Sequence, residues 1–181
     1  EDLISHQIGQ ADVLLSQRLS TAHLKAAKRL KLLQVPGAGV NHLDLAALQN
    51  LQIDVANSHS AAPFVAEHAV AMLLTLMKKI STQDTNLRNG KWLKPTDFAK
   101  DEALFPDSLI GKTVGIVGFG KIGSEISKLL SGFNVNILAL AKNPDVKSRS
   151  NDQKIKFVSL EKLLANVDAL FLSLPLTNET N

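Results

Sequence analysis

Three glycines with the spacing Gly118-x-Gly120-x-x-Gly123 offer the clearest chemistry in the chain. They follow a short apolar run at 113–117 and precede a segment, 121–131, with the periodicity of an amphipathic helix. In such a turn the first glycine allows the bend out of the strand, the second lets a pyrophosphate approach the backbone, and the third lets the helix pack on the sheet. The helix N-terminus then offers unpaired amides to the phosphates. The pattern predicts a dinucleotide-binding turn; the alternative is a glycine-rich turn without a ligand.

The position that usually carries an acid in such a site has none here. Eighteen residues after Gly123 the chain has Ala141, followed by Lys142 and Asn143, and the first carboxylate is Asp145. An acid there would hold the adenosine ribose hydroxyls, so its loss and the added lysine make room for a 2′-phosphate. The sequence therefore favours NADP over NAD. Alternatively, Lys142 is only a solvated loop lysine and NAD binds.

Composition limits the classes of partner. The 181 residues carry a net charge of +3, 45% hydrophobic residues, 4% aromatic residues and no cysteine. Scattered basic residues with few aromatic ones argue against a nucleic-acid surface. The absence of cysteine excludes disulfides and thiolate metal sites and agrees with a cytoplasmic protein. The longest strongly apolar run, 69–77, is too short to span a membrane. We expect no metal site, no nucleic-acid partner and no membrane partner.

Strands and helices are expected to alternate along the chain. The expected strands are 12–16, 31–35, 52–56, 113–117, 135–140, 155–158 and 169–172. The expected helices are 22–30 with Thr21 as N-cap, 43–50, 63–87, 121–131 and 160–166, and 94–107 is expected to be a loop. Strands separated by helices predict parallel sheets with right-handed crossovers, so the fold class is α/β with doubly wound parallel sheets. The best domain boundary lies near 58–63.

Four further motifs carry a family resemblance. They are VPGAGVNHLD at 35–44, VAEH at 65–68, NGKW at 89–92 and SLPLT at 173–177. Together with the glycine motif, in this order, they resemble the D-2-hydroxyacid dehydrogenases, which include glycerate, phosphoglycerate and formate dehydrogenases. The resemblance covers almost the whole chain and says little about which member it is.

The resemblance implies two domains and a longer enzyme. Residues 1–61 would be part of a flavodoxin-like substrate domain. Residues 62–181 would be an incomplete Rossmann-type NAD(P)-binding domain that begins with a long interdomain helix. We expect the chain to be a fragment truncated at both ends. The resemblance also implies a homodimer formed through the cofactor domain and its long helix.

The resemblance further implies an oxidoreductase. Such enzymes transfer a hydride between NAD(P) and a small D-2-hydroxy or 2-keto acid, with a histidine, a carboxylate and an arginine as catalytic residues. Those three would lie beyond residue 181, so no catalytic residue is assigned here and the fragment is expected to be inert. The alternative is a non-catalytic dinucleotide-binding module, such as the corepressors that resemble this family.

Parts of the binding sites can be assigned by the resemblance. Ala38 and Gly39 match a loop whose amides hold the substrate carboxylate, and small residues in a turn after a strand can form such an anion site. The amides of Lys121 and Ile122 would meet the pyrophosphate. Leu174 and Pro175 would form a wall over which the adenine lies. Two departures from the family pattern, Asn41 and Ala61, stand where many members carry Asp and Asn. Glu67 and His68 are interpreted as a structural pair near the hinge.

Overall fold

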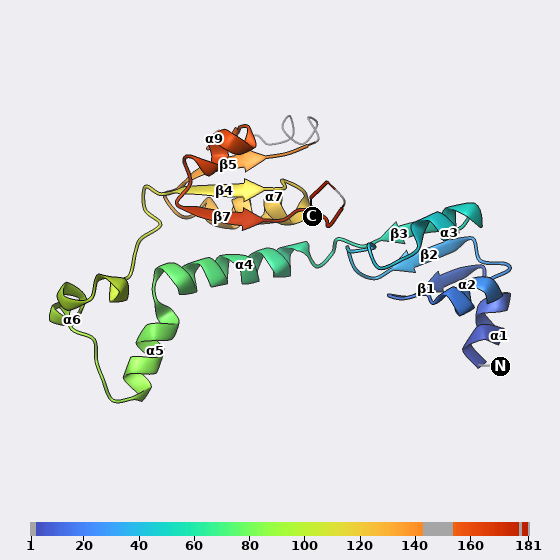
Figure 1. Cartoon of the computed structure of the whole chain (residues 1–181), viewed down its shortest axis with the longest axis horizontal. Coiled ribbons are helices and arrows are strands. Elements are labelled where there is room, and N and C mark those ends of the chain that lie inside the picture. The colour runs from blue at the N-terminus through green and yellow to red at the C-terminus, as the bar shows by residue number, and fades with distance from the viewer. Residues whose placement is uncertain (1–2, 143–153, 178, 181) are drawn as a thin grey trace. The chain divides into compact units, whose positions relative to one another are not determined.

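The computed structural model describes residues 3–142, 154–177 and 179–180. The chain divides into two compact units (Figure 1). One comprises Glu1–Ala61 with Pro175–Asn181, and the other comprises Ala62–Leu174. Each unit is built on a parallel sheet with helical crossovers, which confirms the predicted α/β fold class.

The first unit is a parallel sheet with strand order β1-β2-β3. Its elements are α1 (Leu3–Gln10), β1 (Val13–Leu15), α2 (Thr21–Ala26), β2 (Leu32–Val35), α3 (Leu45–Asn50) and β3 (Asp54–Asn57). Leu33 and Val35 of the central strand β2 are fully buried and form a core with Leu24 of α2 and Leu48 of α3. The strand ends of β2 and β3 are therefore held in fixed register by the apolar core beside them.

The second unit has four parallel strands in the order β6-β5-β4-β7. Its strands are β4 (Thr113–Val117), β5 (Asn136–Leu140), β6 (Ile155–Phe157) and β7 (Ala169–Leu172). Its helices are α4 (Ala62–Met77), α5 (Ile80–Arg88), α6 (Pro95–Lys100), the 3₁₀ turn η1 (Glu102–Leu104), α7 (Lys121–Leu130) and α9 (Leu160–Leu164).

Helices cover both faces of this second sheet. Alternate residues of β4 point to opposite sides, because successive side chains of a strand do so. Ile116 packs with α4 and α7, whereas Val117 packs with Leu163 of α9. Figure 1 shows α9 on one side of the sheet and α7 with α4 on the other. The unit is thus doubly wound, with β4 buried at its centre.

The prediction of one helix over 63–87 is wrong in one respect, because the structure has two helices there. α4 ends at Met77 and α5 begins at Ile80, because Lys79 between them takes the left-handed conformation with φ 54°. The carbonyl of Met77 accepts the N–H of Asp107 at 2.8 Å instead of an N–H of the next helical turn. No Gly, Asn or Pro stands at the break, so the sequence gives no local signal for it.

The loop predicted over 94–107 is also wrong. It contains α6 and η1. Pro95 begins α6, where a missing N–H is harmless, and the Asp97 carboxylate accepts the N–H of Lys94 at 2.8 Å. The helix predicted over 22–30 is shorter than expected. Ser20, not Thr21, is its N-cap, with Ser20 Oγ accepting the N–H of His23.

Candidate functional site

The centre of the second sheet contains a change in strand order. From β4 the chain proceeds to β5 and β6 on one side and then returns to β7 on the other side of β4. In an open α/β sheet, ligands bind outside the carboxyl ends of the strands at such a point. Gly118 directly follows β4 and Ser173 directly follows β7, so the glycine motif lies at this edge.

Two glycines of the motif are required by close packing. Gly118 has φ +94°, and a Cβ on it would lie 2.6 Å from the backbone oxygen of Ser173. A Cβ on Gly123 would lie 2.4 Å from the backbone oxygen of Gly118. Both distances are far below van der Waals contact, so no larger residue fits without movement of the backbone. The strand, the turn and the start of α7 are therefore locked together.

Ser173 completes this contact, and the sequence assigned it no role of its own. Its Oγ donates a hydrogen bond to the carbonyl oxygen of Gly118 at 2.5 Å. Ser173 and Gly118 are far apart in sequence, so only the pairing of β7 with β4 brings them together. A prediction that β7 pairs with β4 would have been the signal for this role of Ser173.

Gly120 has a different environment from the other two glycines. Apart from its neighbours in the chain, no heavy atom of the described residues lies within 4 Å of the position that its Cβ would take. Gly120 is the N-cap of the ten-residue helix α7, so the amides of Lys121 and Ile122 belong to the first turn, where N–H groups have no partner within the helix. An open cradle above helix N-terminal amides fits a pyrophosphate.

The residues after β5 lie partly outside the described structure. β5 ends at Leu140. Ala141 is partly buried and packs against the main core cluster, and Lys142 is exposed. Asn143 lies outside the described residues. Neither of the two described residues that follow β5 carries a carboxylate.

Leu174 and Pro175, predicted as the adenine wall, belong to different units. The side chain of Leu174 lies 3.0 Å from the position of a Cβ on Gly118, so it borders the glycine turn. Leu174 is 45% exposed and leaves an apolar surface there. Pro175 is grouped with the first unit.

The other predicted binding residues follow β2 in the first unit. Ala38 and Gly39 are exposed, and among the described residues neither backbone N–H has a hydrogen-bond acceptor. The carbonyl of Gly37 accepts the N–H of Ser58 at 3.1 Å. The carbonyl of Ala38 accepts Nδ2 of Asn57 at 2.7 Å. Asn57 was not singled out from the sequence.

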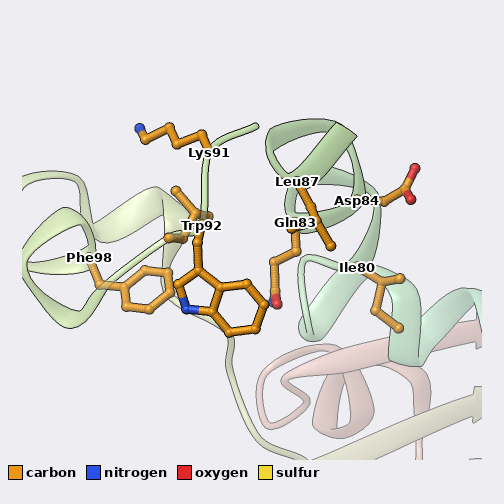
Figure 2. A pocket seen from close by; sticks show the side chains of 8 residues that line it. Ile80, Gln83, Asp84, Leu87, Lys91, Trp92 and Phe98 are labelled. Carbon is orange, nitrogen blue, oxygen red and sulfur yellow. The ribbon is translucent and has the colours of Figure 1, made fainter. Parts of the chain in front are cut away.

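A cavity of about 250 Å³ lies elsewhere in the second unit, between α5 and the segment that leads into α6 (Figure 2). In Figure 2 the rings of Trp92 and Phe98 lie beside each other, and Leu87 approaches from α5. The lining residues are Ile80, Gln83, Asp84, Leu87, Lys91, Trp92, Leu93 and Phe98. The lining is mainly apolar and contains no cluster of groups suited to acid–base chemistry.

A structural cluster at the opposite end of the second sheet contains groups with shifted pKa values. The pKa of the Asp168 carboxyl is lowered, first by the hydrogen bond that it accepts from the N–H of Thr113 and then by Lys112. Lys112 also contacts Asp107 at 3.2 Å, which raises the pKa of its ammonium group. These groups join the starts of β4 and β7, away from the glycine turn.

Metal-binding clusters and long apolar helices are absent from the described part of the chain. No group of three or more His, Cys, Asp or Glu side chains there could hold a metal ion. None of the helices described is both long enough and apolar enough to cross a membrane.

Comparison with known proteins identifies relatives of the whole chain. Residues 70–181 match the model of the D-isomer specific 2-hydroxyacid dehydrogenase, NAD binding domain. A hydroxypyruvate reductase of Thermotoga maritima is 31% identical over 99% of this chain and 56% of its own length. A D-3-phosphoglycerate dehydrogenase of Archaeoglobus fulgidus is 32% identical over 94% of this chain and 31% of its own length.

A solved structure shows the same architecture. The NAD-dependent formate dehydrogenase of Staphylococcus aureus, in complex with NAD, has a TM-score of 0.77 at 29% identity. The match covers 98% of this chain and 53% of that one. The chain thus spans about half the length, or less, of these relatives.

Proposed function

The chain belongs to the D-isomer specific 2-hydroxyacid dehydrogenase family, and from this premise we propose that it is part of an NAD(P)-dependent oxidoreductase. The enzyme transfers a hydride between the nicotinamide cofactor and a small D-2-hydroxy or 2-keto acid. The observation that carries the proposal is the glycine turn at the point where the strand order changes, with an open cradle at Gly120. We assign residues 1–61 to the substrate domain and 62–181 to the cofactor domain, although Pro175–Asn181 is grouped with the first compact unit.

The residues of this chain have binding roles in that reaction. The amides of Lys121 and Ile122 hold the pyrophosphate at the N-terminus of α7, and Leu174 and Pro175 border the adenine. The amides of Ala38 and Gly39 hold the substrate carboxylate. The nicotinamide supplies or accepts the hydride when it is bound. No residue among 1–181 is assigned to proton transfer, so we propose that these residues alone are catalytically inert.

A binding assay and a turnover assay test this proposal together. Isothermal titration calorimetry of residues 1–181 with NADH and with NADPH should show binding. Gly120→Ala should weaken that binding. NAD(P)H oxidation with hydroxypyruvate or glyoxylate should not approach ordinary enzyme rates of about 1–10³ s⁻¹. Turnover at such rates would overturn the proposed inertness. Absence of dinucleotide binding would overturn the assignment of the glycine turn.

The alternative is a non-catalytic dinucleotide-binding module. A longer polypeptide that contains this chain together with the Arg, acid and His motifs would separate the two functions. Dinucleotide binding without turnover of any small 2-keto acid in that polypeptide would favour the binding module.

We further propose that the complete enzyme, of which this chain would be part, prefers NADPH over NADH. Ala141 removes the acid that would repel a 2′-phosphate, and Lys142 adds a cation beside it. A charge-assisted hydrogen bond contributes about 1.5–3 kcal/mol, or roughly ten- to a hundredfold in affinity. Ala141→Asp should reverse the preference, and Lys142→Ala should weaken NADPH binding while leaving NADH binding nearly unchanged. Equal affinities in the unmodified protein would contradict the preference.

The partner of the protein is proposed to be a second copy of itself, and its location cytoplasmic. Large apolar side chains of α4 and of the segment after α5 are exposed, including Phe64 at 73%, Leu76 at 71% and Trp92 at 72%. Such surfaces commonly mark interfaces. Light scattering should give twice the monomer mass at micromolar concentration, and a clean monomer would contradict the proposal.

A further inference from the structure

The turn after β2 is held by hydrogen bonds to the carbonyl groups of two consecutive peptide units. Ser58 N–H donates to the oxygen of Gly37 at 3.1 Å, and Asn57 Nδ2 donates to the oxygen of Ala38 at 2.7 Å. Both donors stand at or just after the end of β3, which pairs with β2. One donor is backbone and the other is a side chain, so only the second depends on residue type.

The orientation of these carbonyls fixes the orientation of two N–H groups. A trans peptide unit is planar, and its C=O and N–H point in opposite directions. The carbonyl of Gly37 shares its plane with the N–H of Ala38, and the carbonyl of Ala38 shares its plane with the N–H of Gly39. Because both carbonyls are bound to the end of β3, both N–H groups point away from it. They are the two amides proposed to hold the substrate carboxylate.

The peptide unit between Ala38 and Gly39 could rotate easily without a hydrogen bond to its carbonyl. It is followed by glycine, and a glycine accepts the change of φ that accompanies a rotation of the peptide plane with little cost. A rotated unit would present the carbonyl oxygen of Ala38 to the substrate in place of the N–H of Gly39. An oxygen facing a carboxylate repels it, so rotation would abolish binding at that amide.

We propose that Asn57 is a positioning residue for substrate recognition, an inference that rests on the proposed function of Ala38 and Gly39. Its carboxamide keeps the peptide unit between these residues in the orientation that binds an anion. Asn57 does not contact the substrate in this role. It is exposed, and no other hydrogen bond of its carboxamide is found in the described structure.

The test follows the amide resonances of Ala38 and Gly39 by NMR in ¹⁵N-labelled protein during titration with oxalate, with chloride as the control anion. In the unmodified protein both resonances should move on addition of oxalate. Asn57→Ala should weaken oxalate binding by roughly five- to tenfold, the effect of one hydrogen bond. Asn57→Asp, which has the same shape but no N–H at neutral pH, should weaken it at least as much. Asn57→Gln, which retains a donor, should recover part of the affinity.

Two further measurements separate positioning from folding. Asn50→Ala changes an exposed asparagine at the end of α3, outside the turn, and should bind oxalate as the unmodified protein does. The resonances of Leu24 and Leu48, which are buried in the same core on α2 and α3, should stay in place in every variant.

Each outcome has one meaning. If oxalate does not move Ala38 or Gly39 in the unmodified protein, the proposed carboxylate site is wrong and the positioning role falls with it. If oxalate binds there equally well in Asn57→Ala and Asn57→Asp, the positioning role alone is wrong and the carboxylate site stands. If the resonances of Leu24 and Leu48 move in the variants, Asn57 supports the fold and the positioning role is likewise overturned.

Discussion

The turn at Gly118–Gly123 and the turn at Gly37–Gly39 each follow a buried parallel strand and expose amides at its carboxyl end. Each accepts a side-chain hydrogen bond from the end of a neighbouring strand, from Ser173 in the first and from Asn57 in the second, but only the first is also limited by close steric contact. In the first, backbone atoms approach each other closely because glycine has no side chain. A Cβ would lie only 2.4 Å from the nearest backbone oxygen at Gly123 and 2.6 Å from it at Gly118. In the second, a Cβ on Gly39 would meet only Asn41 Oδ1, at 3.5 Å, and the turn is held by hydrogen bonds from the end of β3.

The difference shows two ways of fixing an anion-binding backbone. Steric fit limits a position to glycine, whereas hydrogen bonding from a neighbouring strand leaves the turn residues themselves freer. The first turn should therefore be sensitive at its glycines. The second should be sensitive at its hydrogen-bond partners.

The largest effect is expected for Gly123→Ala. Its new methyl group would overlap the backbone oxygen of Gly118, and neither α7 nor β4 can move without disturbing the buried core between them. Overpacking of this kind costs about 1–3 kcal/mol and occasionally more. Thermal unfolding should show a fall in Tm of several degrees. A Tm equal to that of the unmodified protein would mean that close packing does not restrict position 123 to glycine.

Gly120→Ala should separate binding from stability within the same turn. Its methyl group would enter open space, so the free energy of unfolding should change by less than about 1 kcal/mol, the scale of a helix N-cap substitution. The same space is proposed for the pyrophosphate, so NADH affinity should fall at least tenfold, about 1.4 kcal/mol. Calorimetry measures the affinity and thermal unfolding the stability. Unchanged affinity would mean that the cradle is not the phosphate site.

Gly39→Ala should change the stability far less than Gly123→Ala does. Gly39 does not have a positive φ, and an added Cβ makes only an ordinary contact. Reduced entropy of the unfolded chain can even stabilise such a variant by about 0.4–1 kcal/mol. Urea unfolding should show a change within about 1 kcal/mol of zero. A loss as large as that of Gly123→Ala would mean that the second turn is also sterically limited.

The same contrast explains what could be predicted from the sequence. The steric turn was identified from its glycines, and its strand, 113–117, and the strand 169–172 match the structure residue for residue. The carboxylate loop was found only through a family resemblance, and Asn57 was missed, because a hydrogen bond between strand ends depends on strand pairing. The break at Lys79 was missed for a related reason. The left-handed Lys79 lies next to a long-range hydrogen bond, from Asp107 N–H to the carbonyl of Met77, and no local residue type indicates the break.

The smallest expected effect concerns the polar cluster at the opposite end of the second sheet. If steric fit dominates that unit, removing the charge of Asp168 should matter little. Asp168→Asn retains an oxygen that can accept the N–H of Thr113 but loses the attraction to Lys112, a contact of 3.4 Å at an exposed site. At pH 7 the variant should unfold at a slightly lower temperature than the unmodified protein.

The difference in Tm between Asp168→Asn and the unmodified protein should depend on pH, and the direction of that dependence tests the role of the charge. The pKa of Asp168 is lowered in the folded state, chiefly by the hydrogen bond from Thr113 and then by Lys112. The charged carboxylate therefore stabilises the fold above its ordinary value of 3.8, and that contribution is lost as the pH falls through the lower folded-state value. The gap in Tm between the two proteins should close on acidification, and added salt should narrow it at pH 7. A difference in Tm as large as that of Gly123→Ala would show that polar contacts hold this unit as firmly as its glycines do. A difference unchanged at acid pH would show that the charge of Asp168 is not its cause.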